Sequence, residues 1–271
     1  MSHSATWDNL QWAYSPCPND TFIFGALAGG KLPNTHSIPE PQLLDIEQLN
    51  TLAQQGSADV IKVSAALYAE VQESYQILPA GSALGYGVGP LLVARQPIVV
   101  TPECSVAIPG RKTTANMLLS CFYPHLERRE PVLFSEIEGA VQRGEYDLGL
   151  LIHEGRFTYQ ERGLVKIADM GQLWEARYGI PIPLGVICIR RTLPEPLKRE
   201  VAEAIRASLL YARAHPDDIW PYVRQHAQVM DDSVMHSHIA LYVNDFSLEL
   251  GPAGRSAICA LTGIREEGAF V

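Results

Sequence analysis

Short apolar runs alternate along this chain with segments in which apolar residues recur at the spacing of a helix. Strands are predicted at residues 10–14, 37–44, 59–63, 75–78, 89–94, 105–108, 132–134, 148–152 and 184–189. Helices are predicted at residues 46–55, 65–72 and 136–143, and a further helix is expected to start within 113–116 and end at 122. The chain from residue 194 onward has a predominantly helical pattern. Such alternation predicts an α/β fold with mainly parallel sheets.

The strands and helices form two successive series, joined by the predicted strands at 89–94 and 184–189. We therefore expect two lobes, the first formed by residues 1–94 and 188–271 and the second by residues 95–187. A chain of 271 residues with 47% hydrophobic residues is large enough to build both cores. Loops from both lobes would meet in a cleft between them, which is where a small ligand is expected to bind.

A rigid loop follows the first predicted strand. Pro16 and Pro18 lack an N–H and fix φ, so the chain continues neither as a strand nor directly as a helix. Asn19 and Asp20 then offer side-chain acceptors to the free amides of a helix expected to begin near Thr21. The positive end of this helix would attract an anionic small molecule. A capped turn that binds nothing is the alternative interpretation.

Two further segments of the first lobe have the character of ligand-binding loops. The strand end at residues 62–64 carries Lys62 and Ser64, of which Ser64 is also expected to cap the following helix. Residues 81–90 are rich in glycine, which permits close approach of the backbone to a ligand. This segment does not have the spacing of a nucleotide-phosphate loop. A solvated strand-end charge is the competing interpretation of Lys62.

The helix start at residues 113–116 mirrors the first loop, because hydroxyl groups and free amides coincide there. Thr113 and Thr114 follow two basic residues, and two opposed positive helix ends would suit a ligand that carries a carboxylate. The commoner use of such threonines is to cap their own helix.

His153 is the strongest single candidate for chemistry. It ends an apolar strand, and catalytic side chains of α/β folds collect at the carboxyl ends of strands. A neutral imidazole is available as a base near pH 7. The alternative is a histidine that only satisfies a buried hydrogen bond. Arg156 is expected to pair with Glu154 or with substrate.

The other histidines and the cysteines give weaker signals. His236 and His238 are two residues apart on a predicted helix, so they do not share a face, and we predict no metal site. Cys17 lies between two prolines and fits a small packing residue better than a reactive thiolate.

Charge and cysteine content narrow the classes of function. A net charge of -9 argues against broad nucleic-acid binding. Five scattered cysteines without a CxxC motif favour reduced thiols in a cytoplasm. The first residues show no signal peptide, and no apolar run reaches membrane-spanning length. We therefore expect a cytoplasmic protein that binds a small anionic molecule, and neither nucleic acid nor membrane. The helical final third could offer a face for a homodimer.

Six segments together carry a family signature. They are Ser-Pro-Cys-Pro-Asn-Asp-Thr-Phe-Ile-Phe at 15–24, Gly-Ser-Ala-Leu-Gly at 81–85, Gly-Pro-Leu-Leu at 89–92, Thr-Thr-Ala at 113–115, Leu-Ile-His-Glu-Gly-Arg-Phe-Thr-Tyr at 151–159 and Leu-Tyr-Val-Asn at 241–244. In this order they resemble the 1,4-dihydroxy-6-naphthoate synthase family of the futalosine route to menaquinone. The resemblance covers most of the chain, and its first and fifth segments are specific in combination.

The resemblance implies a two-lobed, periplasmic-binding-protein-like (type II) fold with the ligand cleft between the lobes, used inside the cell as an enzyme. It implies cyclic dehypoxanthinyl futalosine as substrate, 1,4-dihydroxy-6-naphthoate as product, release of a three-carbon fragment, and no metal or organic cofactor. His153 would be the catalytic base. The implied substrate pocket lies at residues 62–64, Gly81, Ser82, Thr113 and Thr114. We expect Ala115, next to them at the helix start, to bind substrate as well.

Three alternatives remain at this point. The same fold usually binds small anions without reaction, which would make the chain a solute-binding protein. The sister enzyme of the same route, a chorismate dehydratase, has the same fold. A ligand-sensing domain of a regulator is disfavoured, because the sequence has neither a DNA-binding helix pair nor a basic face.

Overall fold

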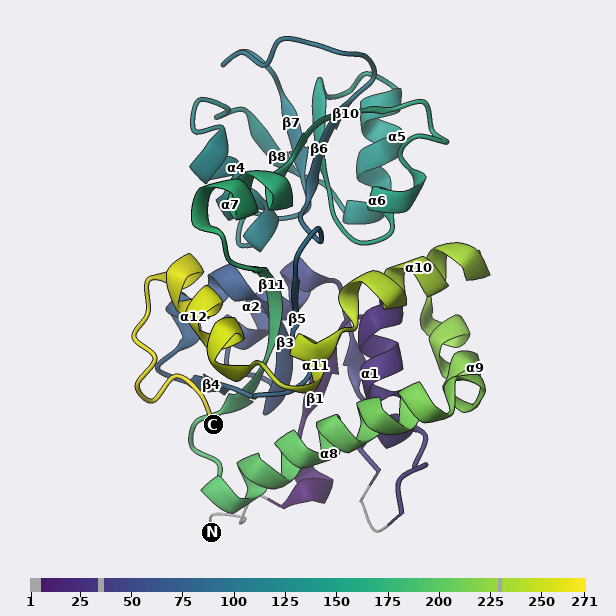
Figure 1. Ribbon diagram of the computed structural model, residues 1–271, viewed down its shortest axis with the longest axis vertical. Helices are drawn as coiled ribbons and strands as arrows, with labels where there is room; N and C mark the ends of the chain where they lie inside the picture. Colours follow the sequence, from purple (N-terminus) through teal and green to yellow (C-terminus); the bar gives the residue numbers. More distant parts are fainter. Residues whose placement is uncertain (1–5, 34–36, 229–230) are drawn as a thin grey trace.

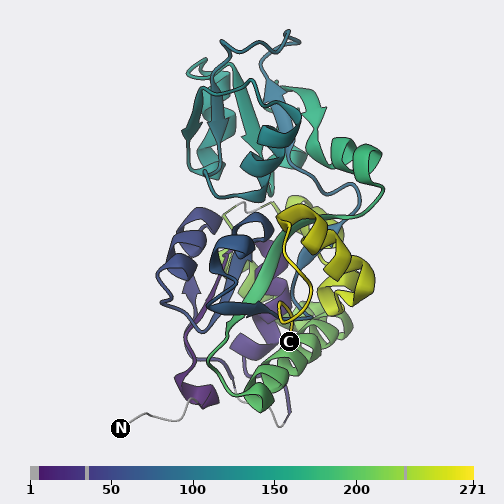
Figure 2. The same ribbon diagram turned by 90° about the vertical axis from the view of Figure 1, so that its left-hand side faces the viewer.

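The computed structural model describes residues 6–33, 37–228 and 231–271. Two sheets, each covered by helices, form two lobes that stand one above the other in Figure 1. Figure 2, turned by 90°, shows the same separation from the side. The lobes are joined by two stretches of chain, one leading into the upper lobe and one returning from it.

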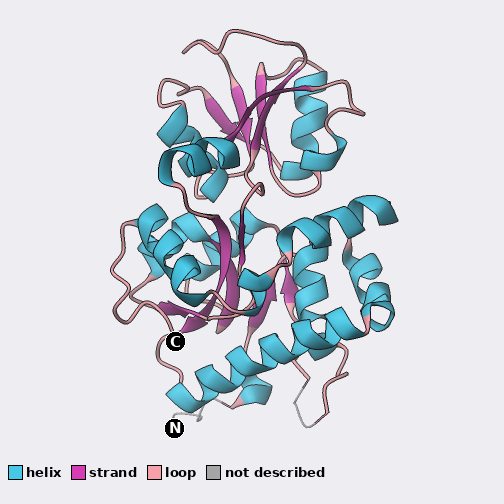
Figure 3. Cartoon of the chain, in the orientation of Figure 1, coloured by secondary structure: helices cyan, strands magenta, loops and turns pink. Residues whose placement is uncertain are grey.

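The sheet of lobe one has six strands in the order β2-β1-β3-β11-β4, with β5 also paired to β11. Its strands are β1 (Trp12–Tyr14), β2 (Gln42–Leu43), β3 (Val60–Ser64), β4 (Tyr75–Ile77), β5 (Ala83–Gly85) and β11 (Ile182–Arg190). β1 runs parallel to β2 and β3, whereas β11 runs antiparallel to β3, β4 and β5. Nearly every residue of β3 and β11 is buried, because helices cover both faces of the sheet (Figure 3).

Helices from both ends of the chain cover lobe one. They are α1 (Pro18–Ala28), α2 (Ile46–Gln54), α3 (Tyr68–Val71), α8 (Glu195–Ala214), α9 (Pro216–His226), α10 (Asp232–Tyr242), α11 (Asp245–Leu248) and α12 (Gly251–Thr262). α1 packs against α8, α9 and α10, so the N-terminal helix is enclosed by the C-terminal third of the chain. On α8, Val201, Ile205 and Leu209 recur every four residues and are fully buried in this core.

The sheet of lobe two has five strands in the order β10-β6-β9-β7-β8. They are β6 (Leu91–Ala94), β7 (Val106–Ile108), β8 (Arg129–Pro131), β9 (Leu148–Leu151) and β10 (Val165–Asp169), and the helices of this lobe are α4 (Thr114–Phe122), α5 (Ile137–Gln142), α6 (Gly155–Thr158) and α7 (Met170–Tyr178). β7 is parallel to β8 and β9, while β6 is antiparallel to β9 and β10.

The expectation of mainly parallel sheets is wrong, because both sheets are mixed. The strands that follow the two crossings, β6 and β11, each enter the middle of a sheet in the antiparallel sense. The expected lobe boundaries are also misplaced, because β6 was expected in lobe one and the boundary at 187/188 would divide β11. β6 pairs within lobe two and β11 begins at Ile182 in lobe one, so the chain crosses before residue 91 and returns before residue 182.

The first crossing packs against the start of α7 in lobe two. A Cβ atom on Gly89 would lie 2.1 Å from the backbone nitrogen of Gly171, so the two backbones approach in a way that only glycine allows. None of the helices in the described part of the chain has the length and apolar character of a membrane span.

Candidate functional site

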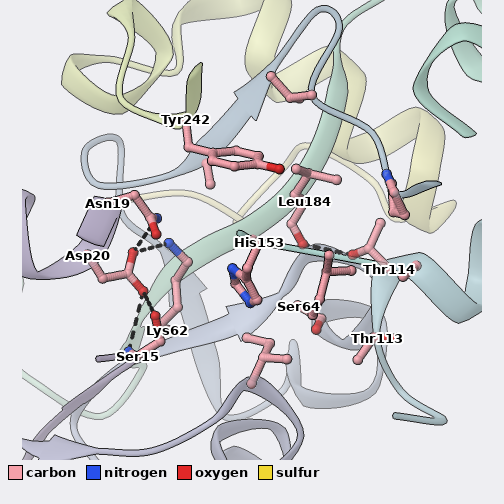
Figure 4. A pocket seen from close by; sticks show the side chains of 17 residues that line it. Ser15, Asn19, Asp20, Lys62, Ser64, Thr113, Thr114, His153, Leu184 and Tyr242 are labelled. Atoms are coloured by element: carbon pink, nitrogen blue, oxygen red, sulfur yellow. Dashed lines mark hydrogen bonds and ion pairs between the residues drawn. The ribbon is translucent and has the colours of Figure 1, made fainter. Parts of the chain in front are cut away.

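A cavity lies between the lobes, and both lobes contribute to its walls (Figure 4). Lobe one contributes Ser15, Asn19, Asp20, Ile46, Lys62, Ser64, Ala83, Leu184, Gly185 and Tyr242. Lobe two contributes Thr113, Thr114, Ala115, Ile152 and His153, and the crossing adds Val88 and Pro90. Eight of the predicted site residues therefore come together here, namely Asn19, Asp20, Lys62, Ser64, Thr113, Thr114, Ala115 and His153.

The loop after β1 builds one polar wall, in a different way from the one predicted. α1 begins at Pro18, with no side-chain cap, so Asn19 and Asp20 lie inside its first turn and do not cap it. Proline is favoured at this position because its missing N–H would have no partner in the helix. The carboxylate of Asp20 instead accepts hydrogen bonds from Ser15 Oγ at 2.7 Å and Lys62 Nζ at 2.6 Å. The side chains of Lys62 and Asp20 are 5% and 2% exposed, so this wall is a buried ion pair.

Ser64 ends β3 on the opposite side of His153 (Figure 4). The predicted cap is wrong, because Ser64 makes no side-chain cap to the turn that follows it. Asn50 binds it instead: the Asn50 amide donates to Ser64 Oγ at 3.0 Å and accepts from the Ser64 backbone N–H at 2.9 Å. Asn50 donates to this hydroxyl, so the Ser64 O–H stays available as a donor to a group in the cavity, which Ser64 lines.

The N-terminus of α4 faces the same space. Thr113 caps the helix by accepting from the Asn116 N–H, and the Thr114 hydroxyl donates to the Leu184 carbonyl at 2.8 Å. Thr113 thus has the commoner use as a helix cap, whereas Thr114 does not cap its helix and binds across the cleft to β11. The amides of Thr114 and Ala115 belong to the first turn and have no acceptor within the helix. Both residues line the cavity, so the N-terminal end of α4 offers these amides as donors of the kind that bind anions.

His153 occupies the turn immediately after β9. Its φ of 52° makes it the one non-glycine residue of the described chain in the left-handed region. Such a conformation costs about 1–2 kcal/mol, and it directs the imidazole into the cavity (Figure 4). The ring lies 5.0 Å from that of Phe134 and 5.9 Å from that of His238, between centroids. Burial lowers the pKa of His153 to about 4, against the opposing charge of Asp20, so the imidazole is neutral near pH 7.

A thiol, an imidazole and a carboxyl group meet beside the cavity. The donor atoms of Cys17, His153 and Glu154 lie within 4.8 Å of one another. Burial raises the pKa of Glu154 to about 7 and raises the pKa of the Cys17 thiol well above its usual value. A cation would require the deprotonated forms of both groups, which this environment disfavours, so we assign no metal to them. The same burial makes Cys17 the packing residue that the sequence indicated.

Three predicted site residues lie outside the cavity lining. Gly81, at a φ of 89°, packs against Ile187 and Ile205 in the core of lobe one. Ser82 is fully buried, and its carbonyl accepts from the hydroxyl of Ser247. These contacts anchor the start of β5, and its first residue, Ala83, lines the cavity.

Arg156 pairs with neither Glu154 nor the cavity. Its guanidinium donates to Asp169 at 2.8 Å and to the carbonyl of Gly89. Asp169 is 4% exposed and caps α7, so its carboxylate is the stronger local attraction for a positive charge. Arg156 thus ties the loop after β9 to the crossing between the lobes.

Two titratable residues at the site were missed by the sequence reasoning. Tyr242, at the end of α10, lines the cavity, and burial raises the pKa of its hydroxyl. His238, one turn earlier, is fully buried and lies 2.9 Å from Asn19 through its Nε2 atom. The segment at 241–244 pointed to Tyr242. Nothing local pointed to His238, because its partner lies 219 residues away in the sequence.

Comparisons with known proteins fit this architecture. A family model described as menaquinone biosynthesis matches residues 10–267. The chain belongs to this menaquinone-biosynthesis family. A relative named 1,4-dihydroxy-6-naphthoate synthase from Thermus thermophilus is 46% identical over 252 residues, which are 93% of this chain and 92% of that protein. A relative of the same name from Streptomyces coelicolor is 45% identical over 259 residues, 94% of this chain and 92% of that protein. The family resemblance drawn from the sequence is confirmed.

Solved structures support the fold of this menaquinone-biosynthesis protein. A protein from Archaeoglobus fulgidus is 35% identical, covers 93% of this chain and 94% of its own, and has a TM-score of 0.86. A Candida albicans protein described as having the generic periplasmic binding protein fold is 12% identical, with coverages of 93% and 89% and a TM-score of 0.63. The second likeness concerns the fold alone. The predicted two-lobed, periplasmic-binding-protein-like architecture is confirmed.

Proposed function

We propose that this chain is a carbon–carbon lyase that converts cyclic dehypoxanthinyl futalosine into 1,4-dihydroxy-6-naphthoate, with His153 as general base. The names of the two relatives support the product, and the family signature supports the substrate. The observation that carries the proposal is a neutral imidazole in a strained turn, aimed into a cavity between two lobes. A protein that only binds an anion has no use for that arrangement.

The chemistry needs a base more than it needs an activated nucleophile. Cleaving the carbon–carbon bond while the aromatic diol forms requires removal of a proton from the ring that becomes aromatic. A positioned base contributes about 10²–10⁴-fold to such a step. With a pKa near 4, His153 is unprotonated across the physiological range, so it is ready to accept that proton without prior ionisation.

The polar wall opposite His153 suits a carboxylate. The free hydroxyl hydrogen of Ser64 and the first-turn amides of Thr114 and Ala115 are donors on one side of the cavity. Lys62 is already neutralised by Asp20, so it adds no free positive charge. A carboxylate on the substrate would therefore bind through dipoles and hydrogen bonds, which fix its orientation relative to His153.

The remaining walls are apolar and would pack against the carbon skeleton of the substrate. They are formed by Ile46, Val88, Pro90, Ile152 and Leu184. We call the donors of Ser64, Thr114 and Ala115 the carboxylate site. The hydrogen bond from Thr114 to the Leu184 carbonyl joins the two lobes and keeps the apolar wall next to this site.

The direct test is incubation of the purified protein with cyclic dehypoxanthinyl futalosine and chromatographic detection of the naphthoate diol. His153→Asn is the matched control, because asparagine tolerates the left-handed conformation at this position. We expect product from the wild-type protein and a loss of at least about 10²-fold in the variant. Binding of substrate without turnover would indicate a solute-binding protein. Dehydration of chorismate, with no naphthoate formed, would indicate the sister enzyme. Either result would refute the proposal.

A further inference from the structure

The hydrogen-bond chain behind His153 has a fixed direction. The side-chain amide of Asn19 donates to Asp20 Oδ1 at 2.9 Å, so its oxygen must face His238. That oxygen lies 2.9 Å from His238 Nε2 and accepts from it, which places the ring proton on Nε2. His238 is completely buried, and burial lowers its pKa well below the usual value, so the ring is neutral and Nδ1 carries a lone pair.

This lone pair has no partner among the described residues, although it is buried. The atom that faces it is Glu154 Oε1, at 3.7 Å. If Glu154 were ionised, two electron-rich atoms would face each other without water, which is costly. A proton on Glu154 converts the contact into an O–H···N hydrogen bond after a small approach of the two side chains.

The surroundings of Glu154 favour that proton. Burial raises the pKa of its carboxyl group to about 7, and the nearby carboxyl group of Glu138 adds to this effect. The titratable groups around it come from four different segments of the chain: Cys17, Glu138, His153, His238 and Tyr242. Among the described residues, no lysine or arginine lowers the pKa of Glu154, so none of them stabilises its ionised carboxylate; Lys62 acts on Cys17 and His153 instead.

We infer that Glu154 is a positioning residue that works in its protonated form: its O–H donates to His238 Nδ1 and extends the chain from Glu154 through His238 and Asn19 to Asp20. This inference rests on the proposed function. The protonated group keeps the wall behind His153 uncharged. An ionised Glu154 within 4.8 Å of a His153 ring nitrogen would favour the imidazolium form, which is no base, and would repel an anionic substrate.

The pH dependence of turnover tests this role. For the wild-type enzyme we expect kcat/KM to fall above pH 7 as Glu154 ionises, to about one hundredth of its plateau at pH 9 if the ionised form is inactive. Glu154→Gln retains an N–H donor and cannot ionise, so its profile should stay flat in this range. Glu154→Leu removes the donor and should lower kcat at least tenfold while KM changes little. Glu138→Gln is the matched control: it replaces a second buried carboxyl group and should keep the alkaline fall, moved to lower pH because the charge of Glu138 raises the pKa of Glu154.

An alkaline fall that persists in Glu154→Gln would overturn the inference, and so would equal activity of the Leu and Gln variants. Infrared spectroscopy reads the proton without turnover. The carbonyl band of a protonated carboxylic acid should disappear from the wild-type spectrum as the pH rises through 7. The difference between the Glu154→Gln spectra recorded below and above pH 7 should lack this band. If the wild-type protein forms no naphthoate, the proposed function fails, and the infrared band still decides whether Glu154 holds a proton.

Discussion

Breaking the ion pair between Lys62 and Asp20 should destabilise the protein strongly. Lys62 Nζ lies 2.6 Å from Asp20 Oδ1, and both side chains are almost completely buried. Removing one partner of such a pair leaves an uncompensated charge and costs about 3–5 kcal/mol. In Lys62→Met, Asp20 keeps its hydrogen bonds from Ser15 and Asn19, so we expect a loss near the lower end, about 3 kcal/mol.

The shift in Tm follows from the size of the chain. An unfolding entropy of about 2.1 cal/mol/K per residue gives about 570 cal/mol/K for 271 residues. A loss of about 3 kcal/mol then lowers Tm by about 5 °C. Scanning calorimetry of Lys62→Met, Asp20→Asn and the double variant measures this directly. The double variant removes both charges, so it should lose less than the sum of the single losses.

A surface pair supplies the control. Arg143 and Glu145 are also 2.6 Å apart, but their side chains are 61% and 51% exposed, so Arg143→Met should barely change Tm. The reasoning is refuted if Lys62→Met shifts Tm no more than Arg143→Met does. It is also refuted if the losses of the Lys62 and Asp20 variants simply add, because two charges that stabilise each other cannot be independent.

Three further changes test other parts of the site. As the pH falls through about 4, His153 becomes protonated and kcat/KM of the wild-type enzyme should drop. The residual activity of His153→Asn should show no such drop at low pH. Gly89→Ala places a Cβ 2.1 Å from the backbone of Gly171, so it should lower both Tm and turnover more than Gly87→Ala, which meets no atom within 4 Å and costs only about 1–2 kcal/mol for its positive φ. Equal effects in calorimetry and rate assays would exclude this account. Ser64→Ala removes a donor from the proposed carboxylate site and should raise KM about tenfold with kcat nearly unchanged. An unchanged KM in steady-state kinetics would show that Ser64 does not bind the carboxylate.

The errors in element prediction have physical causes. β8 was expected at residues 132–134 and lies at Arg129–Pro131, because an edge strand is half exposed and its polar residues give no apolar run. β5 is only three residues long and follows a glycine and a serine, so no periodicity marks it. β10 was not predicted, because it too is an edge strand and is exposed or half-buried along most of its length. The helix expected at 65–72 is a 3-10 turn followed by the short α3.

Some cavity residues could be predicted from their place at a strand end or helix start, whereas the roles of other residues depend on contacts with distant parts of the chain. His153, Lys62 and Thr114 reach the cavity because strand ends and helix starts of an α/β fold gather at one edge of each sheet. Gly81 was singled out for its flexibility, which the fold uses for packing against Ile187. His238 was set aside on the spacing within its own helix, yet its contacts are with α1 and with Glu154.

The sequence by itself determined the two-lobed α/β class, the family and eight of the 17 residues that line the cavity, because periodicity, turn residues and motifs act over short stretches of chain. Only the tertiary structure decided which polar groups are paired. It neutralised Lys62 with Asp20, turned Arg156 toward Asp169 and set Glu154 opposite His238. These outcomes depend on burial, since desolvation decides which groups carry a charge, and burial exists only once segments far apart in the chain have packed together.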